Sequence, residues 1–273
     1  MKDLCPKFGV RLEERIFAKG LDIVPGIRAG KIDLAASALD AAIAGRAAGA
    51  KVFVVAGFAK GGARLVVRKN SRIKKIEDLR GRKIGTARGG AQELLLYAEL
   101  GKHGLSQTDV QVVFFAYSEL NRALKSGQLD AIRQSEPQSS QAIRQGYGVE
   151  LIKPYDTELG EPVRALVMTE KLYRNHDLAL RTLQCFVEST RDFVAHPLEA
   201  QNFVREMMFK GTLSADEYQD ALCNASFTTD ITPEHVQVTA DLMFKYGVGK
   251  LQKALQTKDF VRLDLLEEAK LSK

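Results

Sequence analysis

The feature that most constrains the fold is one pattern that occurs twice, in residues 22–45 and 119–146. In each copy a helical pattern ends at a glycine, an apolar strand follows, and a polar turn leads into the next helix. The paired positions are Gly30 and Asp33 in the first copy and Gly127 and Asp130 in the second. Glycine readily takes the left-handed conformation that ends a helix, and ligands of open α/β sheets bind where such strands end. The pattern predicts either two α/β lobes with facing binding edges or two βαβ segments that are merely alike.

The composition is that of an ordinary soluble globular protein. The chain has 273 residues, 45% of them hydrophobic, and can bury a large core. Its net charge of +6 suits an anionic ligand, but the basic residues are dispersed. The densest basic group, 72–83, lacks aromatic residues that stack on bases, so we expect no nucleic-acid partner. No apolar run reaches the roughly 20 residues of a membrane span, and the first residues do not read as a signal peptide.

The order of predicted elements in the first half describes two lobes. Residues 9–56 read as strand, helix, strand, helix and buried strand, which predicts a mainly parallel sheet, and 57–62 reads as a flexible break. Two strands with matching patterns, 64–69 and 164–169, bracket a second complete α/β unit. These two strands would cross between the lobes and act as a hinge.

The remainder of the chain is mainly helical, and these helices are expected to pack on the first lobe. Helical spacing occurs at 178–195, 197–209, 214–223 and 233–246. The charged end, 258–273, is expected to fray. We therefore predict an α/β protein in which residues 1–67 and 164–273 form lobe 1 and residues 68–163 form an inserted lobe 2.

The turn after strand 83–86 is the best candidate for an anion site. Two glycines let the backbone approach a ligand, and the amides and dipole of the helix that opens at Gln92 favour negative charge. Arg88 can add a two-pronged contact, although a plain turn with Arg88 in solvent fits the same residues. The predicted contacts here are Thr86, Arg88, Gly89, Gly90, Ala91 and Gln92.

Three further turns occupy equivalent positions at strand ends. Asp40 is expected to cap the helix that follows the first of these turns. Glu136 either holds a ligand ammonium group or orients a neighbouring arginine. The predicted contacts in these turns are Ser37, Ala38, Leu39, Gly57, Phe58, Ser135 and Glu136.

Side chains for catalysis or metal binding are sparse. None of the four histidines has a metal-ligand or nucleophile-base spacing, and no hydrolase or zinc-protease motif occurs. The three cysteines, Cys5, Cys185 and Cys223, lack metal-ligand spacing, and Cys185 is expected in the core. Their redox state is left open. The sequence favours binding over turnover, with no catalytic residue, metal or cofactor predicted.

The stretch AGKIDLAASALDAAIAGRAAGAKVFVVAGFAKGGARLVVRKNSRIKKIEDLRGRKIGTARGGAQELLLYAELGKHGL, with GQLDAIRQSEP further on, resembles the solute-binding proteins of ABC importers of the nitrate/sulfonate/taurine type. The resemblance covers residues 9–169 well. It implies a type II periplasmic-binding fold, a periplasmic or lipid-anchored monomer, and a membrane permease as partner. It also implies that the turns named above contact the ligand. Gln134 and Ser135 stand where the family often has an aromatic residue.

One departure concerns the beginning of the chain. Family members have a signal peptide and a first strand before the helix that residues 2–17 enter. We therefore expect an upstream in-frame segment that encodes both, or else a gap of unpaired backbone groups in the first sheet.

Two alternatives to a transport protein remain. The first is a cytosolic enzyme on the same fold, of the menaquinone or thiamin-pyrimidine pathway type, which needs no export signal. The histidine and cysteine cluster of the pyrimidine-forming enzymes is absent. The second is an effector-binding module of a regulator, which would need a partner chain to bind DNA.

Overall fold

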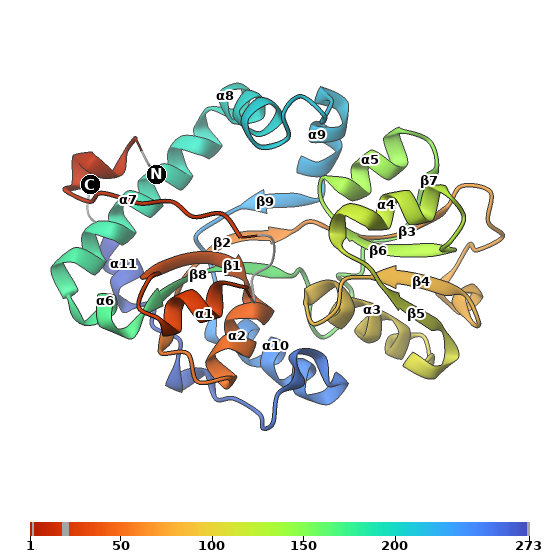
Figure 1. Cartoon of the computed structure of the whole chain (residues 1–273), viewed down its shortest axis with the longest axis horizontal. Helices are drawn as coiled ribbons and strands as arrows, with labels where there is room; N and C mark the ends of the chain where they lie inside the picture. Colours follow the sequence, from red (N-terminus) through yellow and green to blue (C-terminus); the bar gives the residue numbers. More distant parts are fainter. Residues whose placement is uncertain (2, 18–21, 272–273) are drawn as a thin grey trace.

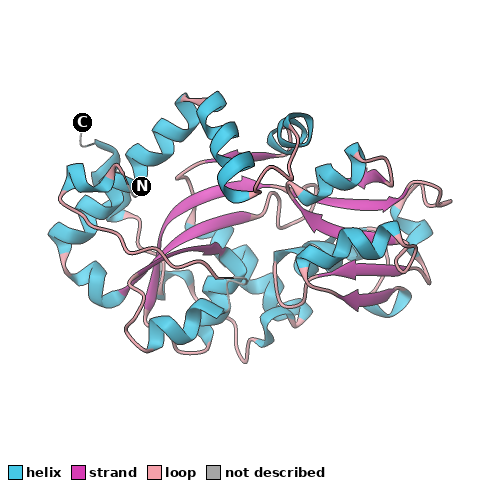
Figure 2. Cartoon of the chain, turned by 45° about the horizontal axis from the view of Figure 1, so that its top comes forward, coloured by secondary structure: helices cyan, strands magenta, loops and turns pink. Residues whose placement is uncertain are grey.

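The computed structural model describes residues 1, 3–17 and 22–271, and within them the chain forms two lobes, each built on one β-sheet (Figure 1). Figure 2 shows the two groups of strands side by side, with helices around both. The α/β architecture with two sheets is as predicted. Within the described ranges, no helix has both the length and the apolar character needed to cross a membrane.

The first sheet has four strands, and every pairing in it is antiparallel. Their spatial order is β1 (Leu34–Ala38), β8 (Val163–Thr169), β2 (Val52–Gly61) and β9 (Ala225–Phe227). The prediction of a mainly parallel first sheet was wrong, because β8 returns from the second lobe and lies between β1 and β2. The pairing is continuous across these four strands, so no gap of unpaired groups lies between them.

The second sheet is mixed. Its order is β5 (Gln111–Phe114), β4 (Lys83–Thr86), β6 (Ala131–Ser135), β3 (Ala63–Arg68) and β7 (Gly148–Ile152). The β4–β5 and β4–β6 pairs are parallel, whereas the pairs made by β3 are antiparallel. The mainly parallel order expected here was therefore wrong as well, because β3 enters from the first lobe.

The helices cover both faces of each sheet. In chain order they are α1 (Ile23–Arg28), α2 (Leu39–Ala47), α3 (Ala91–Lys102), α4 (Tyr117–Lys125), α5 (Gln138–Arg144), α6 (Glu170–Arg174), α7 (His176–Ala195), α8 (Pro197–Asn202), α9 (Ala215–Leu222), α10 (Pro233–Tyr246) and α11 (Asp264–Leu271). In the second lobe, α3 packs on the face of Leu65 and Ile84, and α4 and α5 pack on the face of Val66 and Ile132. The carboxyl ends of β4 and β6 therefore lie between these two layers.

The C-terminal helices join the lobes as well as completing the first one. Helix α10 packs against both α2 and α3, and α9 packs against α5. One hydrophobic cluster accordingly includes Ile43 from the first lobe, Leu95 from the second and Val236 from α10. The expected packing on lobe 1 is thus extended by contacts to lobe 2.

Three local predictions were wrong. Residues 10–17 form no strand, and most of their side chains are exposed. Residues 57–62 are not a loose break, since β2 runs through to Gly61 with β8 and β9 paired on its two sides. The charged end forms α11, whose Leu265 and Leu266 are buried in the core. Residue 21, at the start of one predicted helix, and residues 272–273 lie outside the described part.

A disulfide attaches the beginning of the chain to the first lobe. Cys5 and Cys185 are both fully buried and bonded, with 5.1 Å between their Cα atoms. The prediction of Cys185 as a core residue holds for its burial but missed its partner. Val10 packs beside the pair, so the first described segment is held at one point on α7.

Candidate functional site

Unsatisfied polar groups gather where β4 and β6 end. Thr86, Gln92 and Arg133 are each at most 4% exposed, and each has a side-chain polar atom with no hydrogen-bond partner among the described residues. Gly85 pairs with Ile132, so Thr86 and Arg133 are the next residues along two adjacent parallel strands. Buried polar groups are nearly always hydrogen-bonded, and exceptions require an explanation. A bound ligand supplies one.

Arg133 is the most exceptional of these residues. Its side chain is fully buried in the sheet, and none of its three guanidinium nitrogens has a partner in the described chain. Burial lowers the pKa of Arg133 to about 10, although Tyr155 and Glu99 partly oppose that decrease. The group therefore stays charged at neutral pH. A buried, unpaired cation is costly, so this position favours an anion.

The first lobe contributes Asp40 to the same region. Its side chain is 3% exposed, and Oδ1 has no partner within the described residues. Burial raises the pKa of Asp40 to about 6, opposed by hydrogen bonds from the backbone N–H groups of Asp40 and Ala91 and by the charge of Arg164. A Cβ atom added at Gly90 would lie 3.2 Å from Asp40 Oδ2. Asp40 therefore reaches across to the start of α3 in the second lobe.

Asp40 is not the cap of its helix, as had been predicted. Ala38 is the N-cap of α2, with extended backbone angles of φ −63° and ψ 141°, and it has no side-chain cap. Asp40 lies in the first turn instead, where the helix dipole also favours its negative charge. The helix starts earlier than predicted because β1 leads into it without a separate turn.

The predicted anion turn is partly occupied by carboxylates of the chain itself. Gly89 donates its backbone N–H to Glu93 Oε2 at 2.5 Å, and Ala91 faces Asp40. Gly90 is the N-cap of α3, and Gly89 has a positive φ of 81°, which favours glycine there. The guanidinium carbon of Arg88 lies 3.9 Å from the centre of the Phe114 ring, and Arg88 is exposed.

Glu136 belongs to a structural ion-pair network. Its Oε1 lies 2.9 Å from Arg64 Nε and accepts a hydrogen bond from Asn224, while its Oε2 accepts two from Ser140. Of the two roles considered for Glu136, the one that orients an arginine is therefore observed. Ser135 is half-buried at the end of β6.

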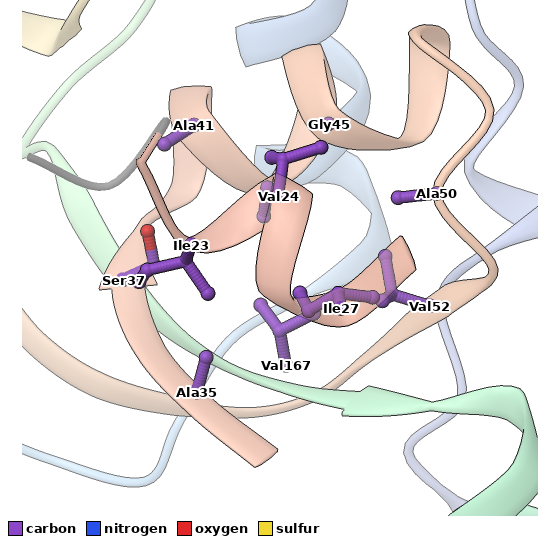
Figure 3. A pocket seen from close by; sticks show the side chains of 11 residues that line it. Ile23, Val24, Ile27, Ala35, Ser37, Ala41, Gly45, Ala50, Val52 and Val167 are labelled. Atoms are coloured by element: carbon purple, nitrogen blue, oxygen red, sulfur yellow. The ribbon is translucent and has the colours of Figure 1, made fainter. Parts of the chain in front are cut away.

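The remaining predicted contacts lie in other surroundings. Leu39 is in the core, and Ala38 is half-buried beside it. Ser37 lines a cavity of about 20 Å³ behind α1, otherwise surrounded by apolar residues (Figure 3). Gly57 packs against the backbone of Asp230, and Phe58 packs against rings on α7 and β9. The structure does not bring these five residues into the group around Arg133, and their ligand contacts stay a prediction.

A larger groove of about 430 Å³ lies between α7, β9 and α11. Its lining includes Val187, Val194, Phe227 and Lys270. None of the buried, unpartnered polar atoms belongs to a residue that lines this groove. The polar group at the ends of β4 and β6 is therefore the stronger candidate site.

Sequence reasoning missed Arg133 and Tyr117. Arg133 follows two apolar residues in a strand, and a charged residue facing the core was the available signal. Tyr117 begins α4, and its hydroxyl would lie 3.6 Å from a Cβ atom at Gly90. Only the folded chain shows that the Tyr117 hydroxyl and the Asp40 carboxylate converge on the start of α3.

Comparison with known proteins agrees with this geometry. The family model described as "NMT1/THI5 like" matches residues 9–200. The chain belongs to this family. One relative is a Bacillus subtilis (strain 168) protein named for aliphatic sulfonate binding, 26% identical over 98% of this chain and 81% of its own length.

Solved structures show the same fold in this family's surroundings. The aliphatic sulphonate binding protein SsuA from Escherichia coli has a TM-score of 0.82 at 22% identity, over 95% of this chain and 85% of that one. The nitrate-binding protein NrtA from Synechocystis PCC 6803 has a TM-score of 0.80 at 15% identity, over 99% and 84%. The desulfurization enzyme DSZB is less similar, with a TM-score of 0.59 at 14% identity over 80% and 79%. The two-lobed binding-protein fold of the family member is thereby confirmed.

Proposed function

We propose that this protein is the solute-binding component of an ABC importer and captures a small anion between its two lobes. The observation that carries the proposal is Arg133, a fully buried guanidinium without a partner in the described chain. A ligand anion would pair with it and remove the cost of the isolated charge. Thr86 would add a hydroxyl at the neighbouring strand end.

The relatives support a transport role and an oxyanion as ligand. The matched proteins bind aliphatic sulfonates or nitrate by their printed names, and they align along most of this chain. A membrane permease would be the partner that receives the ligand. The cytosolic enzyme considered above is less favoured, because the enzyme DSZB has the lower structural similarity.

Lobe closure is part of the same proposal. The lobes would move about the links between β2 and β3 and between β7 and β8. The limits expected at residues 67 and 163 then need one adjustment, since β3 pairs within the second sheet, and we place the first limit at Gly62. Gly61 and Gly62 have positive φ angles of 75° and 72°, as glycine permits at such a link.

We place the protein outside the cytoplasm, in the periplasm or anchored at the cell surface. The Cys5–Cys185 disulfide supports this location, because disulfides persist mainly in oxidising compartments. A measurement of free thiols in protein isolated from its native cells tests the location. Three reactive thiols in the unfolded protein would contradict it, and a single one, from Cys223, would support it.

Isothermal titration calorimetry with nitrate and a series of alkanesulfonates tests the binding function. We expect at least one of these anions to bind without being converted, and Arg133→Gln to weaken its binding about 10- to 100-fold, as for a charge-assisted contact. Arg122→Gln is the matched control, because Arg122 is exposed and pairs only with Glu119 on its own helix. Equal affinity in wild type and Arg133→Gln would refute this site.

A further inference from the structure

The unpartnered groups of the site are of two opposite kinds. Arg133 offers only hydrogen-bond donors, whereas Asp40 Oδ1 and Gln92 Oε1 are acceptors, and both lack partners among the described residues. A bare anion would satisfy Arg133 and leave the two acceptors unpaired. It would also enter a buried site that already contains a carboxylate.

Asp40 already takes part of the anion-binding capacity of α3. Its carboxylate faces the N–H of Ala91, and its Oδ2 lies at the Gly90 end of the helix. α3 has 12 residues, and its start is thus neutralised by a side chain from the opposite lobe. A ligand anion is therefore directed to Arg133, and the part of the ligand near α3 meets a negative charge.

Tyr117 lies under the influence of both charged groups. Asp40 raises the pKa of Tyr117, while Arg164 and Arg133 lower it. The Tyr117 hydroxyl also approaches Gly90, as Asp40 does. The site therefore has a cationic end at Arg133 and an anionic end at Asp40, with Tyr117 facing both.

From this polarity we infer that Asp40 is a specificity-determining residue. It selects anions that carry a hydrogen-bond donor on the part facing the first lobe, and it excludes ligands with a second negative charge there. This inference rests on the proposed function, because it assumes that the group around Arg133 binds an anion. Asp40 donates nothing to the ligand and acts through its charge and its free Oδ1.

A series of ethanesulfonates that differ only at carbon 2 tests the inference by calorimetry at pH 7.5. The substituents are hydrogen, hydroxyl, ammonium and carboxylate. We expect the hydroxyl and ammonium forms to bind at least about 10-fold more tightly than the unsubstituted form, and the carboxylate form to bind at least 10-fold more weakly. The matching series of propionates covers a site that prefers a carboxylate at Arg133.

Asp40→Asn keeps the shape of the side chain and removes its charge. In this variant we expect the ammonium and carboxylate forms to differ by less than about threefold, while the unsubstituted anion binds as well as before. Asp192→Asn is the control, because Asp192 is exposed on α7 and pairs with His196. It is expected to leave the order of affinities unchanged.

The outcomes separate the two proposals. Equal binding of all four substituents, or an unchanged order in Asp40→Asn, would overturn the role of Asp40 and leave the anion-binding function standing. Failure of every anion to bind, with Arg133→Gln indistinguishable from wild type by thermal shift, would overturn the function itself.

Discussion

Replacing Arg133 by methionine is expected to stabilise the ligand-free protein and to remove its anion site. Burial lowers the pKa of Arg133 from its ordinary 12.5 to about 10. Because each pKa unit corresponds to about 1.4 kcal/mol, the charged form is disfavoured by roughly 3 kcal/mol in the folded state. The sign follows directly: the depressed pKa of a base destabilises the fold wherever the group is charged, which includes neutral pH.

Methionine has a similar volume and no charge, so the variant should recover most of that free energy. For a chain of this size the gain corresponds to a rise in Tm of roughly 6–10 °C. Differential scanning calorimetry of the ligand-free protein measures it, and titration with the anion that the wild type binds measures the loss of affinity. Stability and binding are thus expected to change in opposite directions.

Arg64→Met provides the control on the adjacent strand. Arg64 is equally buried, but it lies within 3.1 Å of carboxylate oxygens of Glu136, Glu150 and Asp220. Its removal leaves those acids uncompensated and should cost about 3–5 kcal/mol. A lower Tm for Arg133→Met, or a loss of stability equal to that of Arg64→Met, would show that Arg133 is a paired structural residue and refute the reasoning.

Three other predictions concern stability. Cys5→Ser should lower the free energy of unfolding by about 2–5 kcal/mol in urea titrations, and a reductant should then have no further effect on the variant, since its disulfide with Cys185 is gone. Asp40 has its pKa raised from 3.8 to about 6, so its burial costs roughly 3 kcal/mol above pH 6 and nothing below about pH 4. Asp40→Asn should therefore be more stable than wild type at pH 7.5 but not at pH 4, and an equal difference at both values would contradict the assignment. Gly57→Ala should destabilise by about 1–3 kcal/mol, because its Cβ would lie 2.2 Å from the Asp230 carbonyl oxygen, and an unchanged Tm would show that this contact can relax.

The elements with strong local signals were predicted well. The strand at Lys83–Thr86 and the helix at Pro233–Tyr246 have the predicted limits. Thr232 caps that helix and a glycine in the left-handed conformation ends it, so its two ends are encoded within a few residues. Elements without such signals, such as residues 10–17, depended on partners that the local pattern does not name.

The candidate site was predicted only in part. Thr86 and Gln92 were named because a strand that leads through two glycines into a helix is a local pattern. Arg133 was not named, since its burial results from β3 and β4 on its two sides and α3 above it. Asp40 was interpreted as a cap because its contact with Ala91 joins segments of different lobes.

The sequence by itself determined which segments form helices and strands, the presence of two α/β lobes, and the family. These properties follow from periodicity, caps and turn residues, which act over a few positions along the chain. Only the tertiary structure decided the direction of strand pairing in the first sheet, the Cys5–Cys185 bond, and the meeting of Asp40 with α3 near Arg133. Those outcomes depend on contacts between residues far apart in the chain, and on burial, which turns an ordinary arginine into an unpaired charge.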